Sequence, residues 1–361
     1  MLWVNAMSRR KCTRPITLAG FFPAGKLSHF CCGFLLVLAL CAATPAWSQP
    51  PPGFPGHRHP QFHLPAAAPW ATNVVAADAP ANVAYRFVTI PAPGTLAQAN
   101  SINDDGVLTG IYSNPTTHTQ SFIWKDGVFR TVDYPGHAYT YLWQLNNNGQ
   151  AIGYYGDGTI AHTVIYSVES GTWTPLPDIP GYSYNLGYGL NDAGLVIGNT
   201  YDDTYTINVA WIWDPTTRSY SFFTVPGSAQ YSTIPNEIND KGQIGGWYQD
   251  SGGTYHGFIK EYGTYTTVDF PGASNTLPDG ISNTGVLQGQ VLTAAPAYAA
   301  EGFIATPGGV FETVNYPGQT MTTLVGINGR GDVCGFYQED ANPNVWIAFV
   351  AYRTGPISAV P

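Results

Sequence analysis

The sequence is poor in charged side chains. Asp, Glu, Lys and Arg make up 10% of its 361 residues, against about 25% in an ordinary globular chain. Basic residues are scarce, 14 against 23 acidic ones, which argues against the basic stripe of a nucleic-acid binder. A disordered chain would also lack aromatic residues, yet 14% of this one is aromatic. Glycine (41) and proline (29) are abundant instead, and such a turn-rich, aromatic composition favours an all-β protein.

The N-terminal segment has the order of a secretory signal peptide. Five of the fourteen basic residues precede an apolar run over residues 30–43, which is shorter than the roughly 20 residues of a membrane-spanning helix. The small-x-small site Ala46-Trp47-Ser48 follows it. This order predicts a signal peptide over residues 1–48, with an uncleaved anchor as the alternative. We therefore expect an exported protein, in the periplasm or the medium, with no membrane contact after cleavage.

Cleavage would change both the cysteine content and the charge. Four of the five cysteines would leave, so Cys334 alone remains and no disulfide can form within the mature chain. The mature chain keeps nine basic and 23 acidic residues, a net charge of −14. That charge disfavours nucleic acid and anionic membranes and permits cationic ligands. We expect a monomer without a cofactor.

A spacer is predicted over residues 49–83, because the segment is rich in Pro and Ala and has no sustained hydrophobic period. It contains His57, His59 and His63. A loose metal site is one interpretation of these histidines. Since no cysteine or carboxylate nearby completes a ligand set, we favour a solvated linker without metal.

Three sequence marks each occur six times after residue 84, at a period of about 45 residues. The first is an apolar residue, Asn, two residues, Gly, three residues and Gly. Its Asn positions and final glycines are Asn103 and Gly110, Asn146 and Gly153, Asn191 and Gly198, Asn239 and Gly246, Ser282 (in place of Asn) and Gly289, and Asn328 and Gly335. The second mark is Pro-Gly, beginning at residues 93, 135, 180, 226, 271 and 317. The third is a small residue before Phe122, Val164, Trp211, Phe258, Phe303 or Phe349.

Each period holds four strand-like segments. In the second repeat we expect strands over 141–145, 150–155, 162–167 and 172–176, with the Asn-rich tract as the hairpin turn between the first two. A meander of four strands in about 45 residues is the size of a propeller blade. The chain begins this region on a fourth-strand segment, 85–90, and ends it on a third-strand segment, 346–352. We therefore predict a six-bladed β-propeller over 84–355, closed by the N-terminal strand, with a β-solenoid as the alternative.

The repeat resembles a known family. The order Asn-Asp-x-Gly-x-x-x-Gly, then His256-Gly257-Phe258, then a run ending in Pro-Gly, is similar to the HAF-type extracellular repeat of bacteria. Gln120-Ser121-Phe122 and Glu301-Gly302-Phe303 are weaker copies. The resemblance covers about 84–355 and implies an exported, propeller-like protein, but no particular activity. Since the chain ends at Pro361 without an apolar tail, we expect release rather than surface anchoring.

Strings typical of common catalytic and calcium-binding sites are absent: the sequence has no H-E-x-x-H, G-x-S-x-G, P-loop or EF-hand pattern. Asp104, Asp192 and Asp240 are interpreted as turn formers. Cys334 precedes a repeated glycine and is interpreted as a small buried residue rather than a nucleophile.

Candidate site residues are those that break the repeat, because repeated residues serve the scaffold. Aromatic residues gather in the predicted fourth-to-first connections, and acids join them in the second-to-third loops; Glu237 and Asp279 add carboxylates on the predicted channel strands. The candidate ligand-binding residues are Tyr139, Tyr141, Trp143, Tyr182, Tyr184, Tyr188, Tyr201, Asp202, Asp203, Tyr205, Tyr231 and Glu237.

Two functions are compatible with this set. Aromatic faces with carboxylates suit a glycan or a cationic peptide, which favours a non-catalytic binding or scaffold module. The alternative is a hydrolase or lyase acting on polysaccharide through a carboxylate pair, with Glu237, Asp279 and Asp202 as candidates. The tyrosines could also simply pack between blades.

Overall fold

The computed structural model describes residues 85–114, 118–292 and 300–355. The predicted signal peptide, the spacer and its three histidines lie outside the described residues. Within the described ranges the chain forms 24 strands and no helix, so the all-β prediction is confirmed. None of the described segments is a helix long and apolar enough to cross a membrane.

The strands form six consecutive four-stranded units, numbered here in chain order. The first strands are β2 (Leu96–Ile102), β6 (Tyr139–Leu145), β10 (Tyr184–Leu190), β14 (Ser228–Ile238), β18 (Asn275–Ile281) and β22 (Met321–Ile327). The second strands are β3 (Leu108–Asn114), β7 (Gln150–Gly156), β11 (Val196–Tyr201), β15 (Ile244–Asp250), β19 (Leu287–Leu292) and β23 (Val333–Glu339). The third strands are β4 (His118–Lys125), β8 (Ala161–Ser167), β12 (Asn208–Asp214), β16 (Tyr255–Glu261), β20 (Ala300–Ala305) and β24 (Asn342–Arg353). The fourth strands are β5 (Val128–Val132), β9 (Trp173–Pro175), β13 (Ser219–Phe223), β17 (Thr264–Val268), β21 (Phe311–Thr313) and, for the sixth unit, β1 (Tyr85–Thr89).

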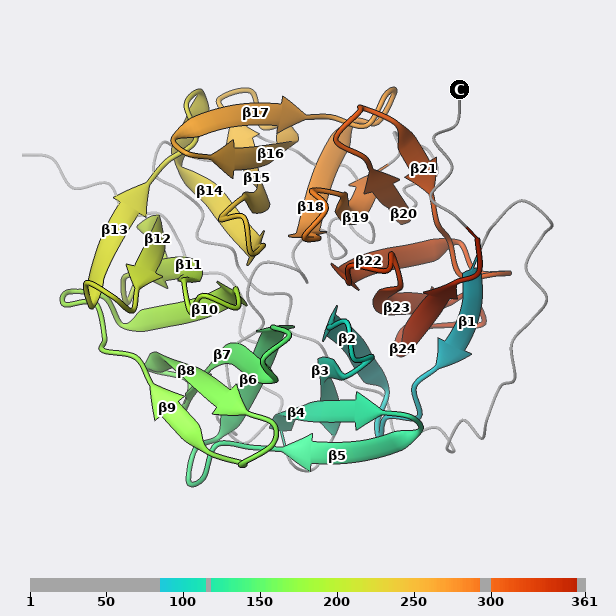
Figure 1. Ribbon diagram of the computed structural model, residues 1–361, viewed down its shortest axis with the longest axis horizontal. Coiled ribbons are helices and arrows are strands. Elements are labelled where there is room, and N and C mark those ends of the chain that lie inside the picture. The colour runs from blue at the N-terminus through green and yellow to red at the C-terminus, as the bar shows by residue number, and fades with distance from the viewer. Residues whose placement is uncertain (1–84, 115–117, 293–299, 356–361) are drawn as a thin grey trace, which may run out of the picture.

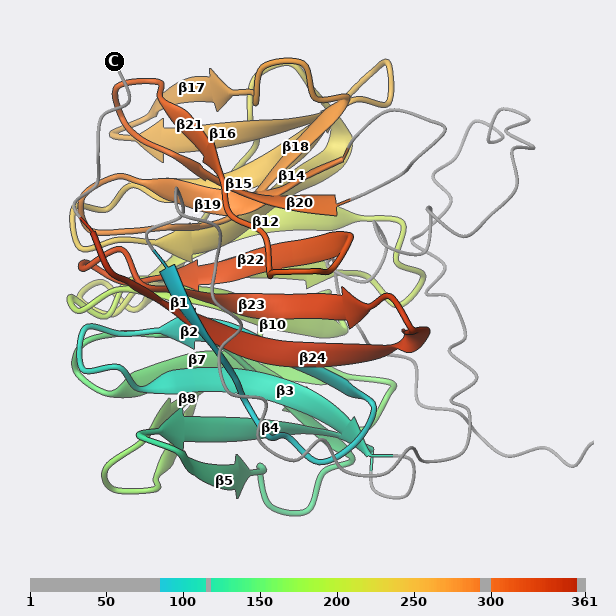
Figure 2. The same cartoon turned by 90° about the vertical axis from the view of Figure 1, so that its right-hand side faces the viewer.

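The units lie around a common centre, with their first strands innermost (Figure 1). These first strands contact one another in the order β2, β6, β10, β14, β18 and β22, and β22 contacts β2. Seen from the side, the units stack as twisted sheets (Figure 2). This is a propeller-like arrangement, and the strand segments expected for the second repeat agree with β6 to β9 to within two residues at each end.

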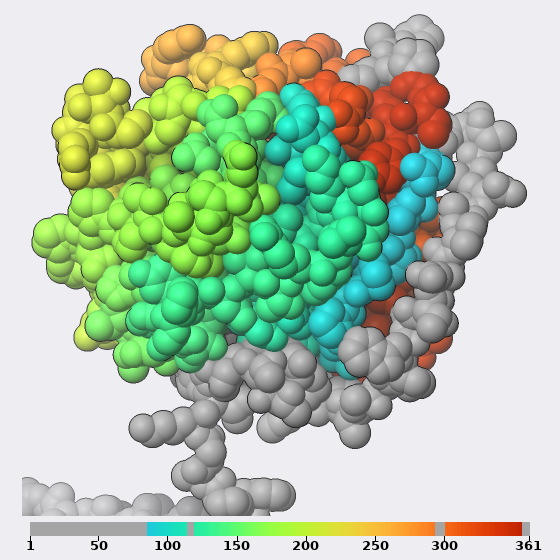
Figure 3. Space-filling model, turned by 60° about the horizontal axis from the view of Figure 1, so that its bottom comes forward, coloured from blue at the N-terminus to red at the C-terminus, as the bar shows by residue number. Residues whose placement is uncertain are grey.

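The two ends of the described chain meet in the sixth unit. β1 pairs antiparallel with β24, in a register that runs from Tyr85 opposite Arg353 to Thr89 opposite Phe349. Figure 3 shows β1 (blue) at the surface between the C-terminal strands (red) and the first unit (green). Phe87 of β1 is buried and packs on Phe349 and Tyr316, with ring centroids 5.5 and 5.3 Å apart. The predicted pairing of the N-terminal strand with the last third strand is therefore present.

A β-bulge in each first strand explains the final glycine of the repeated mark. The register of every first strand slips where it pairs with this glycine or just after it. A Cβ at Gly289 would lie 2.2 Å from the Leu277 carbonyl oxygen, and the five equivalent glycines show the same approach at 1.8–2.3 Å. Only glycine lets the bulged backbone come this close. The bulge therefore requires the final glycine of the first repeated mark.

In three units a side-chain pair connects the start of the third strand, where the third repeated mark lies, to the segment just before Pro-Gly, the second mark. His256, two residues before Phe258, contacts Asp269, two residues before Pro271, with Nδ1 2.9 Å from Oδ2. His162 and Asp178 repeat the pair at 2.9 Å, and Gln120 with Asp133 at 2.6 Å. Each pair joins the start of a third strand to the segment that follows the fourth. The weaker copy at Gln120 therefore keeps the carboxylate partner although it changes the donor.

Two belts of hydrogen bonds connect neighbouring units at the turns between first and second strands. In the first belt, the side-chain Nδ2 of each repeated Asn donates to the backbone carbonyl of the equivalent residue in the next unit. Its links are Asn103 to Asn146, Asn146 to Asn191, Asn191 to Asn239, Asn239 to Ser282 and Asn328 to Asn103, all at 2.9–3.2 Å. In the second belt, the following N–H donates to the side-chain oxygen of its counterpart. Its links are Asp104 to Asn147, Asn147 to Asp192, Asp192 to Asp240, Asp240 to Asn283 and Gly329 to Asp104, at 2.7–2.9 Å.

Both belts are interrupted at the same place, between the fifth and sixth units of the described chain. Ser282 replaces the Asn whose amide would reach the sixth unit. Its hydroxyl still accepts the Val286 N–H at 3.1 Å, as the Asn Oδ1 does in other units, but it has no amide group to donate to the sixth unit. Gly329 has no side chain to accept the N–H of Asn283. The interface between these two units is therefore held by fewer polar links than the other five.

We expect Ser282→Asn to restore one missing link. The new Nδ2 would donate to the Asn328 carbonyl, and one added intramolecular hydrogen bond contributes about 1 kcal/mol to the free energy of unfolding. The midpoint of thermal unfolding should rise by roughly 2–4 °C in a calorimetric scan. Asn239→Ser is the matched control, since it opens the same gap between the fourth and fifth units and should lower the midpoint by a similar amount. An unchanged midpoint in Ser282→Asn would contradict this account of the belt.

Candidate functional site

The six bulges place one residue each into the space between the first strands. These residues are Asn100, Trp143, Tyr188, Asn236, Asp279 and Val325, and all six line a single pocket, here called the channel pocket. Each lies three residues before the repeated Asn or Ser, so the position is set by the scaffold while the residue type differs. Bulges commonly re-aim side chains in this way. The variable residues of the repeat thus converge on one place.

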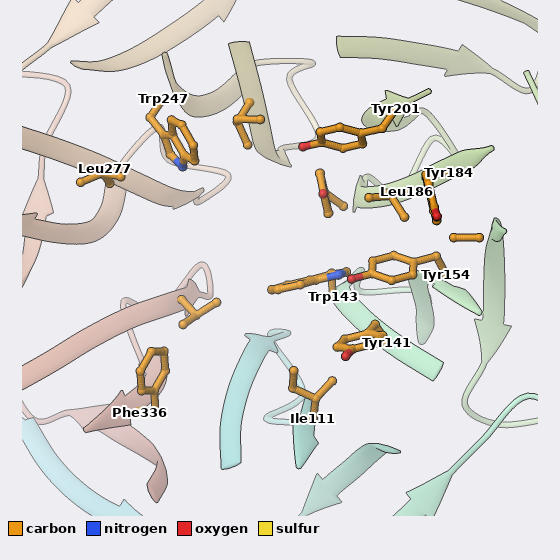
Figure 4. Packing of buried hydrophobic residues seen from close by; sticks show 14 of the residues in the cluster. Ile111, Tyr141, Trp143, Tyr154, Tyr184, Leu186, Tyr201, Trp247, Leu277 and Phe336 are labelled. Carbon is orange, nitrogen blue, oxygen red and sulfur yellow. The ribbon is translucent and has the colours of Figure 1, made fainter. Parts of the chain in front are cut away.

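Three of the ten residues that line the channel pocket are aromatic. Trp143 and Tyr188 meet edge to face, with ring centroids 5.8 Å apart. Trp247 of β15 lines the pocket from the other side, and Figure 4 shows Trp143 and Trp247 both pointing toward the middle of the ring. The cavity volume is about 30 Å³, and one water needs about 10–15 Å³ of such space. As it stands, the pocket holds a group of one or two heavy atoms and not a sugar ring.

Glu237 and Asp279 bring two carboxyl groups to this pocket. Burial raises the pKa of Glu237 to about 8, although hydrogen bonds from the Ile281 N–H and the Gln144 side chain oppose the rise. Burial, and then repulsion from Glu237, raises the pKa of Asp279 well above its usual range. Burial therefore favours the protonated form of both carboxyl groups when nothing cationic is beside them.

Glu237 also has a structural duty. Its Oε2 accepts the N–H of Ile281 in the next unit at 2.8 Å. Gln144 accepts the Leu190 N–H at 2.7 Å, and Ser101 the Leu145 N–H at 3.0 Å, from equivalent positions. The unit that receives the long side chain of Glu237 has glycine at its own equivalent position, residue 280. A Cβ on Gly280 would lie 2.0 Å from Glu237 Oε2. Glu237 is thus one of three side chains at this position of the repeat that accept a backbone N–H of the next unit.

The surrounding protein binds only one of the two carboxyl oxygens of Asp279. Its Oδ1 accepts a hydrogen bond from Asn236 Nδ2 at 3.3 Å, and the same Nδ2 donates to the Pro278 carbonyl at 2.9 Å. Asp279 Oδ2 is buried and has no hydrogen-bond partner, while the residue as a whole is 5% exposed. A buried carboxyl oxygen without a partner costs free energy, as do the amide atoms of the buried Gln288, which also have none.

A second pocket lies beyond Glu237 and Gln144, which line both. It is formed by the belt residues at the turns, among them Asp104, Asp192 and Asp240. Burial and then the charge of Asp240 raise the pKa of Asp192. Because these acids accept the belt hydrogen bonds, the structure gives them a role beyond forming turns.

The expectation that the aromatic candidates lie in connections and loops between strands is wrong for most of them, and the alternative that they pack between units holds. Most of them lie on the strands themselves and are buried, because a first strand packed on both sides carries aromatic residues like any core strand. Tyr141 stacks on Tyr154 at 5.0 Å and Tyr184 on Tyr205 at 4.4 Å. The buried members are Tyr139, Tyr141, Trp143, Tyr184, Tyr188 and Tyr201, each 8% exposed or less. Tyr182, Tyr205 and Tyr231 are half-buried, and Tyr231 lies within β14 rather than in a connection.

The acids of the loop after β11 do not join the channel pocket. Although partial burial raises the pKa of Asp202, hydrogen bonds from Thr204, Ile207 and Thr206 outweigh it and lower the pKa. Both of its oxygens are used inside its own loop. Asp203 is exposed. The structure therefore brings together Glu237, Asp279, Trp143 and Tyr188 of the predicted set, and leaves Asp202 out.

Sequence reasoning missed Asn100, Asn236 and Trp247 as pocket residues. The first two could have been found by aligning the repeats at the position three before the repeated Asn. Trp247 could not, because it enters from β15. Cys334 is fully buried, as expected, and burial raises the pKa of its thiol. Among the described residues no three His, Cys, Asp or Glu side chains converge to hold a metal.

Comparisons with known proteins give likeness in structure alone. No family model and no curated protein matches the sequence. Among solved structures, the chain is similar to TolB from Acinetobacter baumannii (11% identity, TM-score 0.47, covering 73% of this chain and 66% of that one). It is similar to a gluconolactonase from Xanthomonas campestris (12%, 0.48, covering 79% and 98%). It is also similar to the Aleuria aurantia lectin in complex with Fucα1-6GlcNAc (11%, 0.43, covering 75% and 99%).

Proposed function

We propose that this chain is an exported, monomeric, non-catalytic binding module built as a closed six-bladed β-propeller of the HAF-repeat type. Its ligand is a glycan or a cationic peptide that reaches the channel pocket. The observation that carries the proposal is the ring of bulge residues, where an otherwise repeated scaffold presents six positions of differing chemistry. The circular contacts of the first strands and the pairing of β1 with β24 support the closed form.

The acidic and aromatic character of the pocket favours the cationic class of ligand. Protonated carboxyl groups can ionise when a cation arrives, and indole and phenol faces attract positive charge. Few of the candidate tyrosines are available to stack on a sugar, because most of them are buried between units. A glycan would therefore have to bind at the rim of the pocket rather than inside it.

A catalytic role is the second candidate, favoured by the adjacency of Glu237 and Asp279. A carboxyl group with a raised pKa can act as a general acid. Against this, Glu237 holds the backbone of the next unit, and equivalent positions carry Gln144 and Ser101, which have no acid–base chemistry of this kind. We therefore place binding first.

A glycan array and a library of Lys- and Arg-containing peptides test the proposal directly. We expect a saturable hit whose affinity, measured by calorimetry, falls at least tenfold in Trp143→Leu. Phe222→Leu is the matched control, since Phe222 is 52% exposed on the outer strand β13, and it should bind as the unchanged protein does. Product analysis on every hit decides between the candidates: turnover that disappears in Glu237→Gln would establish the enzyme instead.

A further inference from the structure

The channel pocket contains a buried carboxyl oxygen whose chemistry the scaffold does not explain. Asp279 Oδ2 is buried, without a partner, and belongs to a residue that lines the pocket. Asn236 holds the other oxygen and also binds the Pro278 carbonyl, which fixes the carboxyl group in place. A fixed, buried acceptor of this kind is matched by a donor that enters from outside.

We propose that the channel pocket seats a primary ammonium group, bound by the carboxylate of Asp279 between Trp143, Tyr188 and Trp247. The inference rests on the proposed binding function and names the group that the ligand presents. A lysine side chain or a free N-terminus of a partner peptide carries such a group. On binding, the ammonium donates to Asp279 Oδ2, with the Glu237 carboxyl beside it.

The size of the cavity selects among cations. An ammonium head is about as large as a water, so a volume of about 30 Å³ accepts it together with the start of its alkyl stem. A planar guanidinium, with four heavy atoms, is too large for this volume.

The composition of the walls selects against a metal ion. Calcium requires six to eight oxygen ligands, most of them usually carboxylates, whereas no three His, Cys, Asp or Glu side chains converge among the described residues. Aromatic faces, by contrast, stabilise an organic cation once it has lost water. The charge of the pocket and its apolar wall therefore point to the same kind of group.

The test uses the full mature chain and n-butylammonium as the probe, with n-butanol and calcium chloride at equal ionic strength as comparisons. Binding is followed by tryptophan fluorescence, because two tryptophans line the pocket, and by the ligand-dependent midpoint of thermal unfolding. We expect saturable binding of n-butylammonium, at least tenfold weaker in Asp279→Asn. Asp202→Asn should bind within twofold of the unchanged protein, because that acid is enclosed by its own loop.

Equal affinity for n-butanol, unchanged affinity in Asp279→Asn, or stabilisation by calcium in place of n-butylammonium would each overturn the proposal. If Asp279→Asn does not fold, Glu237→Gln decides in its place, since Gln144 shows that an amide serves at this position; unchanged affinity there would also overturn it. A glycan found on the array that binds Asp279→Asn normally, without n-butylammonium binding, would refute the ammonium seat and leave the binding module standing.

Discussion

Replacing Gly289 by alanine is expected to cost about 3 kcal/mol of unfolding free energy, at the upper end of the range for an overpacked site. The added Cβ would lie 2.2 Å from the backbone oxygen of Leu277 and 2.6 Å from the Cα of Pro278. Neither atom can rotate away as a side chain would, so the first strand of the fifth unit must shift. The midpoint of thermal unfolding should fall by on the order of 6–10 °C.

Gly308→Ala is the control for this change. Gly308 lies in a turn where an added Cβ would meet nothing closer than 3.8 Å, and its φ is not in the left-handed region. It should leave the midpoint within about 1–2 °C, since a compatible Gly-to-Ala change alters stability by less than about 1 kcal/mol. If the two variants melt together, the bulge is not the reason for the repeated glycine.

Removing residues 85–90 is expected to abolish the stable monomer. The deletion takes away the whole β1–β24 ladder and the buried rings of Tyr85 and Phe87. Losing one buried Phe side chain alone typically costs 3–5 kcal/mol. It also uncovers the edge of β24, and unpaired strand edges recruit other chains. Light scattering after size-exclusion chromatography should report oligomers or aggregates, with a midpoint well below that of the intact chain.

A chain that begins at residue 84 provides the comparison, because it retains β1. It should remain monomeric and melt as the mature protein does. A milder variant, Phe87→Ala, keeps the strand and removes its main contacts with Phe349 and Tyr316. A monomeric, equally stable 85–90 deletion would show that the N-terminal strand does not close the sixth unit.

The sequence predicted the strands well because their signals are local. Asn103 stabilises the hairpin turn at Gly106 through hydrogen bonds to residues two and four positions further on. The repeated mark can therefore be recognised without knowledge of the fold. The belts were not predictable in this way. The link from Asn328 to Asn103 joins residues 225 apart and exists only once the units are arranged around a centre.

The site was predicted only in part for a related reason. Asp279 and Glu237 could be singled out because they break the repeat, but nothing local distinguishes a carboxyl group fixed inside a pocket from one held by its loop, as Asp202 is. Tyr141 and Tyr184 were interpreted as ligand-binding residues because the sequence alone does not distinguish an aromatic side chain packed in a core from one that binds a ligand. Burial on both sides of the first strands separates the two cases.

Because of the bulge in each first strand, the residues that maintain the fold are different from the residues that line the pocket. The glycine that permits the bulge and the Asn that fixes the turn recur in the repeat, while the residue three positions before that Asn varies. The residue type at this position therefore differs from unit to unit although the backbone around it is the same; the six residues are Asn100, Trp143, Tyr188, Asn236, Asp279 and Val325. A duplicated copy of such a chain can acquire a new ligand by single substitutions at these positions, without any change in strand register.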